Sequence, residues 1–213
     1  MKFKSKEDYV RAKPKKKDLF LALFGHEELS DSLIELAHNF FVEDMWISVG
    51  CELSFSRKDL LKFSIPQGTP DKLKDLFVVF GQATHSGSSY AFYKTKNSKH
   101  CNEWPVVVLG DEGGVLVIAK NIFDLFRFWS LQVVQPHITT DYNTNKYEFD
   151  LFVDEEALSE LEENGMNNDD FKHWIKNKFQ LESMHSIKQV TKEIIKPAQE
   201  LYQEEIDALF KNY

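Results

Sequence analysis

The stretch that most constrains the fold is WPVVVLGDEGGVLVIAKNIFDLFRF, Trp104 to Phe128. Two apolar runs, 106–109 and 115–119, flank a glycine-rich centre, and short apolar runs bounded by turn residues are typical of buried strands. After Asn121, apolar residues recur at the i, i+3, i+4, i+7 spacing of an amphipathic helix, namely Ile122, Leu125, Phe126 and Trp129. The passage therefore predicts a β-hairpin followed by a helix that packs on the sheet.

The centre of that stretch, GDEGG at 110–114, holds three of the chain's nine glycines. Phosphate-binding loops join a strand directly to a helix, whose first amides point at the ligand. Here the glycines lie between two predicted strands, and no lysine followed by Ser or Thr completes a P-loop. Because glycine tolerates positive φ angles, the composition predicts a hairpin turn with Asp111 and Glu112 at its exposed tip.

Similar patterns predict further elements before this stretch. Ser30 to Phe41 has the spacing of an amphipathic helix that Ser30 or Asp31 caps, and 45–55 alternates like a strand. Residues 76–80 and 90–93 are expected to form a second hairpin through a polar turn at 81–89.

The character of the chain changes after Leu131. A polar segment, 139–146, precedes helical patterns at 154–163, from 169, and at 187–209 with an interruption at Pro197. We therefore predict three parts: a basic lead at 1–18, an α+β domain at 19–135 and a mainly helical extension at 136–213.

Charge is unevenly distributed along the 213 residues. Residues 1–18 carry eight Lys or Arg against three acids, so the remainder holds 18 basic against 31 acidic residues, a net charge of −13. Between Glu148 and Asp170 there are ten acids and no Lys or Arg. Such a body repels a phosphate backbone and attracts a basic surface, so we expect a protein partner and no nucleic acid.

Candidate chemical groups are sparse and scattered. Cys51 and Cys101 lack the spacing of a disulfide framework or a zinc site, which favours a reducing cytoplasm and no metal or cofactor. No signal peptide and no membrane span are expected, since the apolar runs are too short. A hydrolase assembled from His85, Ser86, His100 and Cys101 is the less favoured alternative.

Two segments taken in order carry a resemblance to a known family. ATHSGSSYAFYK, from Ala83, is followed by EWPVVVLGDEGGVLVIAKNIFDLFRFW, from Glu103. This order of turn, strand, strand, Gly-Asp-Glu-Gly, strand and Phe-rich helix resembles the second half of the SUKH superfamily, the Smi/Knr-like fold, over about 50 residues. The resemblance implies an α+β fold with a twisted, mostly antiparallel sheet and helices packed against it. The hairpin and helix patterns lead to the same fold class.

The resemblance also implies a function in binding rather than catalysis. Members of the superfamily are largely bacterial immunity proteins that neutralise toxin domains, often nucleases or deaminases, and related regulatory scaffolds. We therefore expect a non-enzymatic immunity protein, with a regulatory scaffold as the alternative. The oligomeric state stays open. The residues expected to contact the partner are Trp104, Asp111, Glu112, Asp154, Glu155 and Glu156.

Overall fold

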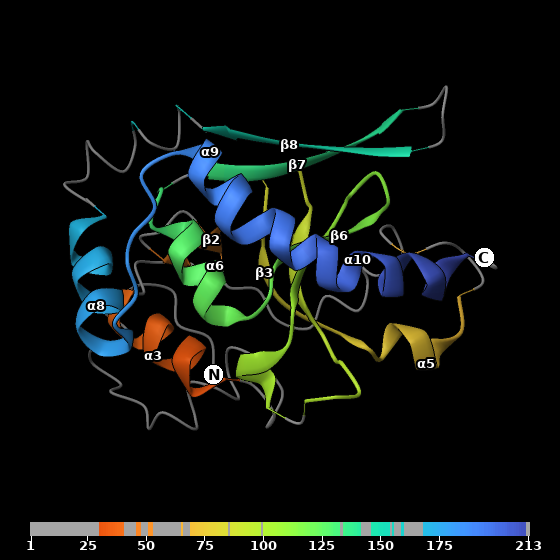
Figure 1. The fold of residues 1–213 in the computed structure, drawn as a ribbon, viewed down its shortest axis with the longest axis horizontal. Helices are drawn as coiled ribbons and strands as arrows, with labels where there is room; N and C mark the ends of the chain where they lie inside the picture. Colours follow the sequence, from red (N-terminus) through yellow and green to blue (C-terminus); the bar gives the residue numbers. More distant parts are fainter. Residues whose placement is uncertain are drawn as a thin grey trace.

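An antiparallel sheet forms the centre of the protein, which we describe from a computed structural model. The fold is α+β, with helices against both faces of the sheet, as predicted (Figure 1). The structure describes residues 30–40, 46–47, 51–52, 65, 69–84, 86–98, 100–132, 134–141, 146–153, 155, 159 and 168–211. The basic lead at 1–18 lies outside these ranges.

The sheet is a meander in which each strand pairs with the next along the chain. All five pairings are antiparallel. The four longer strands confirm both predicted hairpins, and a four-residue helix, α5 (Asp71–Lys74), precedes them. The strands are β1 (Trp46–Ile47), β2 (Cys51–Glu52), β3 (Phe77–Gln82), β4 (Ser89–Tyr93), β5 (Val106–Leu109) and β6 (Val115–Ala119).

The glycines between β5 and β6 form a hairpin turn, which confirms the prediction. The Gly110 amide donates to the Gly114 carbonyl at 3.0 Å, and Gly113 and Gly114 adopt φ angles of 105° and 90°. A Cβ at Gly110 would lie 2.3 Å from the Gly113 carbonyl oxygen, closer than van der Waals contact allows. The turn therefore needs glycine at all three positions.

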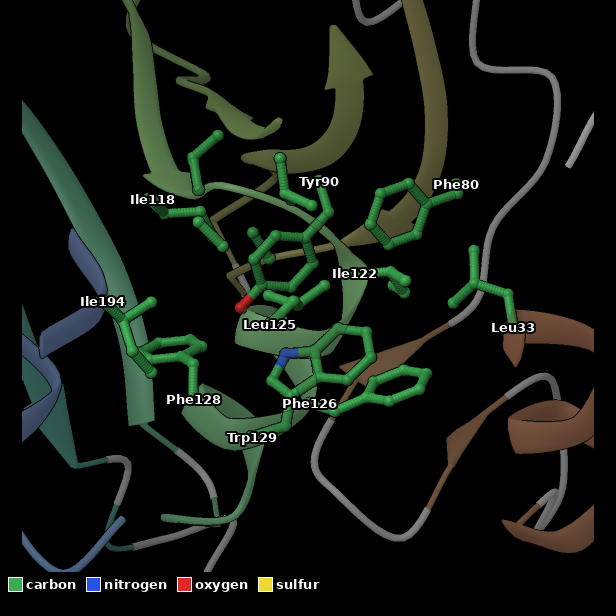
Figure 2. Packing of buried hydrophobic residues seen from close by; sticks show 14 of the residues in the cluster. Leu33, Phe80, Tyr90, Ile118, Ile122, Leu125, Phe126, Phe128, Trp129 and Ile194 are labelled. Atoms are coloured by element: carbon green, nitrogen blue, oxygen red, sulfur yellow. The ribbon is translucent and has the colours of Figure 1, made fainter. Parts of the chain in front are cut away.

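One face of the sheet packs against α3 (Asp31–Phe40), α6 (Ile122–Trp129) and α8 (Asp169–Phe179). Figure 2 shows Phe80 and Tyr90 of the sheet pointing toward α6, with Leu33 of α3 beside them. We call this packed region the first core. Asn121 is the N-cap residue of α6. Its side-chain oxygen accepts a hydrogen bond from the Asp124 backbone N–H at 2.9 Å, which gives one of the first amides of the helix a partner.

The opposite face packs against α10 (Lys196–Phe210) and forms a second core. Because side chains alternate along a strand, neighbouring residues enter different cores: Phe77 and Val79 face α10, while Val78 and Phe80 face α6. The Phe77 and Phe210 rings stack with centroids 6.0 Å apart. Both faces of the sheet are thus covered, which explains why its strands are nearly continuous apolar runs.

A helical segment passes from the first core to the second. It comprises α9 (Ile187–Val190), the π-helical turn η2 (Thr191–Ile195) and α10, drawn in blue in Figure 1. Ile194 packs in the first core and Ala198 in the second. The π turn lies just before Pro197, where the prediction placed an interruption, and its wider hydrogen-bond ring accommodates a residue without an N–H.

This helical segment also closes the outer edge of β6. The Val117 amide donates to Gln203 Oε1 at 2.8 Å, and Gln203 Nε2 donates to the Val115 carbonyl at 2.9 Å. The side-chain amide therefore bonds β6 as a peptide group of a neighbouring strand would. An edge strand whose backbone groups are covered in this way does not offer them to another chain.

Residues 134–141 and 146–153 form a two-stranded ribbon where the sequence suggested a polar connection. β7 (Val134–Asp141) pairs with β8 (Lys146–Val153) in antiparallel register. The predicted boundary between 135 and 136 thus falls inside β7. Ile138 and Leu151 belong to the first core, and the later helices supply residues to both cores. The segment 136–213 begins with this ribbon and continues with helices that complete the same fold.

The bonds from Gln203 predict a specific stability loss. Gln203→Met keeps the length of the side chain but leaves the Val117 N–H and Val115 C=O without their partner, so we expect about 1–3 kcal/mol of destabilisation in urea unfolding. Gln199→Met on the same helix leaves both bonds intact and serves as the control. Equal unfolding midpoints for the two variants would contradict the role of Gln203.

Candidate functional site

Asp111 lies in the β5–β6 turn and also forms hydrogen bonds with Ser88. Its carboxylate accepts from the Ser88 hydroxyl at 2.6 Å, and its backbone N–H donates to the same hydroxyl at 3.3 Å. These bonds tie the β5–β6 turn to the β3–β4 turn, so Asp111 orients the loop tips. Glu112 is exposed beside it, as the sequence predicted.

Trp104 lies in the first core and not on a contact surface. Its side chain is 6 % exposed, and its indole N–H donates to the Ser98 carbonyl at 3.0 Å. Lys94 Nζ lies 5.9 Å from the ring centroid. The structure therefore places Trp104 in the core and not at the surface where the sequence suggested a partner contact, because its ring packs beside β4 and β5.

The acidic segment that follows the ribbon is only partly described. Glu155 is exposed, whereas Asp154 and Glu156 lie outside the described residues. Nearby on β8, Asp150 is also exposed. Among the three acids predicted to meet a partner, Glu155 is thus the one that the structure describes, and it is exposed like Asp150.

The ribbon carries exposed apolar side chains on β8. Phe152 and Val153 are 40 % and 41 % exposed, whereas Val134 and Ile138 of β7 are 8 % and 3 % exposed. β7 is therefore the inner strand and β8 the outer one, at the margin of the molecule in Figure 1. The imidazole of His137 stands nearly perpendicular to the Phe152 ring at 5.9 Å between centroids.

We define the outer ribbon surface as His137, Asp150, Phe152, Val153 and Glu155. Sequence reasoning identified the acids here but missed Phe152 and Val153. The available signal was alternation of apolar and polar residues in KYEFDLFV, which is typical of a strand.

The four residues of the hydrolase alternative are not brought together where the structure describes them. Ser89 pairs with Leu109, and Phe92 pairs with Val106. Ser86 thus precedes one end of this strand pair, while Cys101, buried in η1 (Cys101–Glu103), lies beyond the other end. His85 lies outside the described residues. The exposed Ser86 hydroxyl bonds Thr84 Oγ1 at 2.8 Å.

A polar pocket of about 280 Å³ lies between the loop after β4 and α10. Two carboxylates on its walls each accept from a hydroxyl: Glu205 from Tyr93 at 2.8 Å and Glu103 from Ser98. Burial, together with the Glu205 carboxylate, raises the pKa of the Tyr93 phenol well above its ordinary value. The pocket is lined by Thr95, Lys96, Asn97, Ser98, Glu103, Tyr202 and Glu205.

No local sequence pattern indicates this pocket, because the residues of its two walls are far apart in the chain, as Tyr93 and Glu205 are, 112 positions from each other. The pocket is a polar cleft in which hydrogen bonds hold two carboxylates, Glu103 and Glu205, in place. Within the described ranges, no group of three or more His, Cys, Asp or Glu is placed to hold a metal ion.

Comparisons with protein-family models, with characterised proteins and with solved structures give no match for this chain. Separately, none of the helices in the described part of the chain combines the length and apolar character needed to cross a bilayer.

The Tyr93–Glu205 bond predicts a pH-dependent contribution to stability. Since the folded-state pKa of Tyr93 is raised, the contribution is fully present below the unfolded pKa of about 10 and is lost as the pH rises further. Between about pH 8 and about pH 11, the wild type should therefore lose more unfolding free energy than Tyr93→Phe.

Urea unfolding at both pH values measures this difference. Tyr202→Phe removes a half-buried phenol from the same pocket and is the control, which should follow the wild type. An unchanged pH dependence in Tyr93→Phe would contradict the account of this bond.

Proposed function

We propose that this chain is a protein-binding module that neutralises a toxin domain, of nuclease or deaminase type, by direct binding through the outer ribbon surface. The observation that carries the proposal is the exposure of Phe152 and Val153 on β8 beside the carboxylates of Asp150 and Glu155. The sequence resemblance to the SUKH superfamily supports the same function.

This combination of groups suits a protein partner with a basic surface. Phe152 lies on the same face of β8 as Asp150, and its exposed ring provides apolar contact area of the kind that is enriched at the centres of interfaces. The surrounding carboxylates steer a basic partner into the encounter. Enzymes that act on nucleic acids present basic surfaces to phosphate, so an acidic ribbon is complementary to them.

The direct test is binding of the full chain to the protein encoded by the adjacent gene, followed by an assay of that protein's activity. Neutralisation requires both a complex and loss of activity. A complex that leaves the activity unchanged favours the regulatory scaffold. If the neighbouring gene product neither binds nor is inhibited, the immunity function is wrong.

Charge reversal tests whether the acids of the ribbon guide recognition. Asp150→Lys combined with Glu155→Lys should slow association by about tenfold at low salt, with a smaller difference at high salt, because charge steering is screened. Stopped-flow or surface-based kinetics measure the rate.

The control for this variant is Glu200→Lys combined with Glu204→Lys, which makes the same change in net charge at exposed positions of α10. An equal effect from both pairs would show that only the net charge matters. That result would remove the ribbon from recognition.

A further inference from the structure

Pro136 determines which backbone groups of β8 point outward. Residues opposite each other in an antiparallel pair alternate between those that exchange two backbone hydrogen bonds and those that exchange none. Pro136 pairs with Leu151 and has no N–H, so this pair belongs to the second kind. The N–H and C=O groups of Leu151 therefore point away from β7, and by the same alternation so do those of Val153.

The hydrogen bond made by Leu151 agrees with this assignment. Its N–H donates to the Asp150 carboxylate at 2.8 Å. On that side of β8 no strand is paired among the residues that the structure describes. The outer edge of β8 thus differs from the edge of β6, which Gln203 covers.

We propose that the outer edge of β8 accepts a basic strand of the partner protein, which extends the ribbon from two strands to three. This inference rests on the proposed binding function and specifies how the partner is held. Backbone bonds to Leu151 and Val153 supply affinity that does not depend on the partner's side chains. The exposed side chains of Phe152 and Val153 lie on opposite faces of β8, so each contacts the residue of the added strand that lies on its own face.

Asp150 determines the charge of the added strand. In the free chain its carboxylate accepts a hydrogen bond from the Leu151 N–H. A Lys or Arg across from Asp150 offers the carboxylate a stronger, charge-assisted partner and releases the N–H to a carbonyl of the incoming strand. An acidic or neutral strand provides no such exchange.

The same charges argue against a second copy of this chain as the occupant. β8 carries one basic residue, Lys146, against Glu148 and Asp150, so two β8 strands side by side would bring more carboxylates than lysines to one interface. Like charges facing each other across strands are destabilising. The charge complement of this edge is a basic strand.

A proline at the edge tests the inference with little change to the side chains. Val153→Pro removes an N–H that points away from β7, so the bonds within the ribbon remain. Val153→Thr keeps the N–H and the branched shape and is the matched control. We expect Val153→Pro to weaken binding of the adjacent-gene product by about tenfold or more, and Val153→Thr by no more than about twofold.

Calorimetry on the full-length variants measures the affinities, and circular dichroism melting confirms that both variants fold. If the wild type binds and Val153→Pro binds equally well, the edge inference is wrong while the binding function stands. If the wild type does not bind this protein, the proposed function fails for that partner, and a synthetic probe then decides the edge inference.

The probe is a capped heptapeptide of alternating lysine and valine, added to the isotope-labelled full chain and followed by NMR. The expected result is a shift of the Leu151 and Val153 amides that is absent with a glutamate-valine peptide and reduced in Val153→Pro. Shifts that avoid β8, or that are equal in Val153→Pro, overturn the inference. A concentration-dependent dimer that Val153→Pro abolishes would replace the basic strand with a second copy.

Discussion

Burial of the central sheet on both faces is the constraint on which the rest of the structure depends. Alternate residues of β3 to β6 enter two different cores, so the sheet is stable only when helices cover both of them. On one face, α3 and α6 pack against the sheet (Figure 2) and α8 packs with them in the same core, while α10 covers the other face. The C-terminal helix α10 is therefore a layer of the fold, since without it the apolar side chains of Phe77, Val79 and Val107 would face water.

The path of the C-terminal helix gives the two strand edges different properties. As the segment passes from the first core to the second, Gln203 bonds the backbone of β6 and closes that edge. The ribbon has no such cover over β8 in the described part of the chain, where Phe152 and Val153 are exposed. One edge is protected from other chains, and the other combines backbone groups, apolar contact area and negative charge in one place.

The elements predicted correctly are those whose local pattern and tertiary environment agree. The two hairpins, the turn at 110–114 and α6 have unambiguous apolar runs, positive-φ glycines and a cap at Asn121. The ribbon was missed because threonines and charges mask its alternation. Trp104 was predicted at the surface but is buried, because the sequence does not distinguish an aromatic residue of the core from one at a contact surface. The pocket at Tyr93 and Glu205 depends on contacts between distant segments, which no local pattern reports.

The two edges differ in how their outward N–H groups are held: Gln203 bonds the Val117 N–H of β6, whereas among the described residues no strand pairs with β8 on the side to which the Val153 N–H points. Amide hydrogen exchange of the free, full-length chain, resolved by residue, tests this claim most directly. We expect slow exchange of the Val117 amide, which Gln203 holds, and exchange of the Val153 amide that is faster by orders of magnitude. Equal protection at the two positions, or a Val117 amide that exchanges faster than Val153, would contradict it.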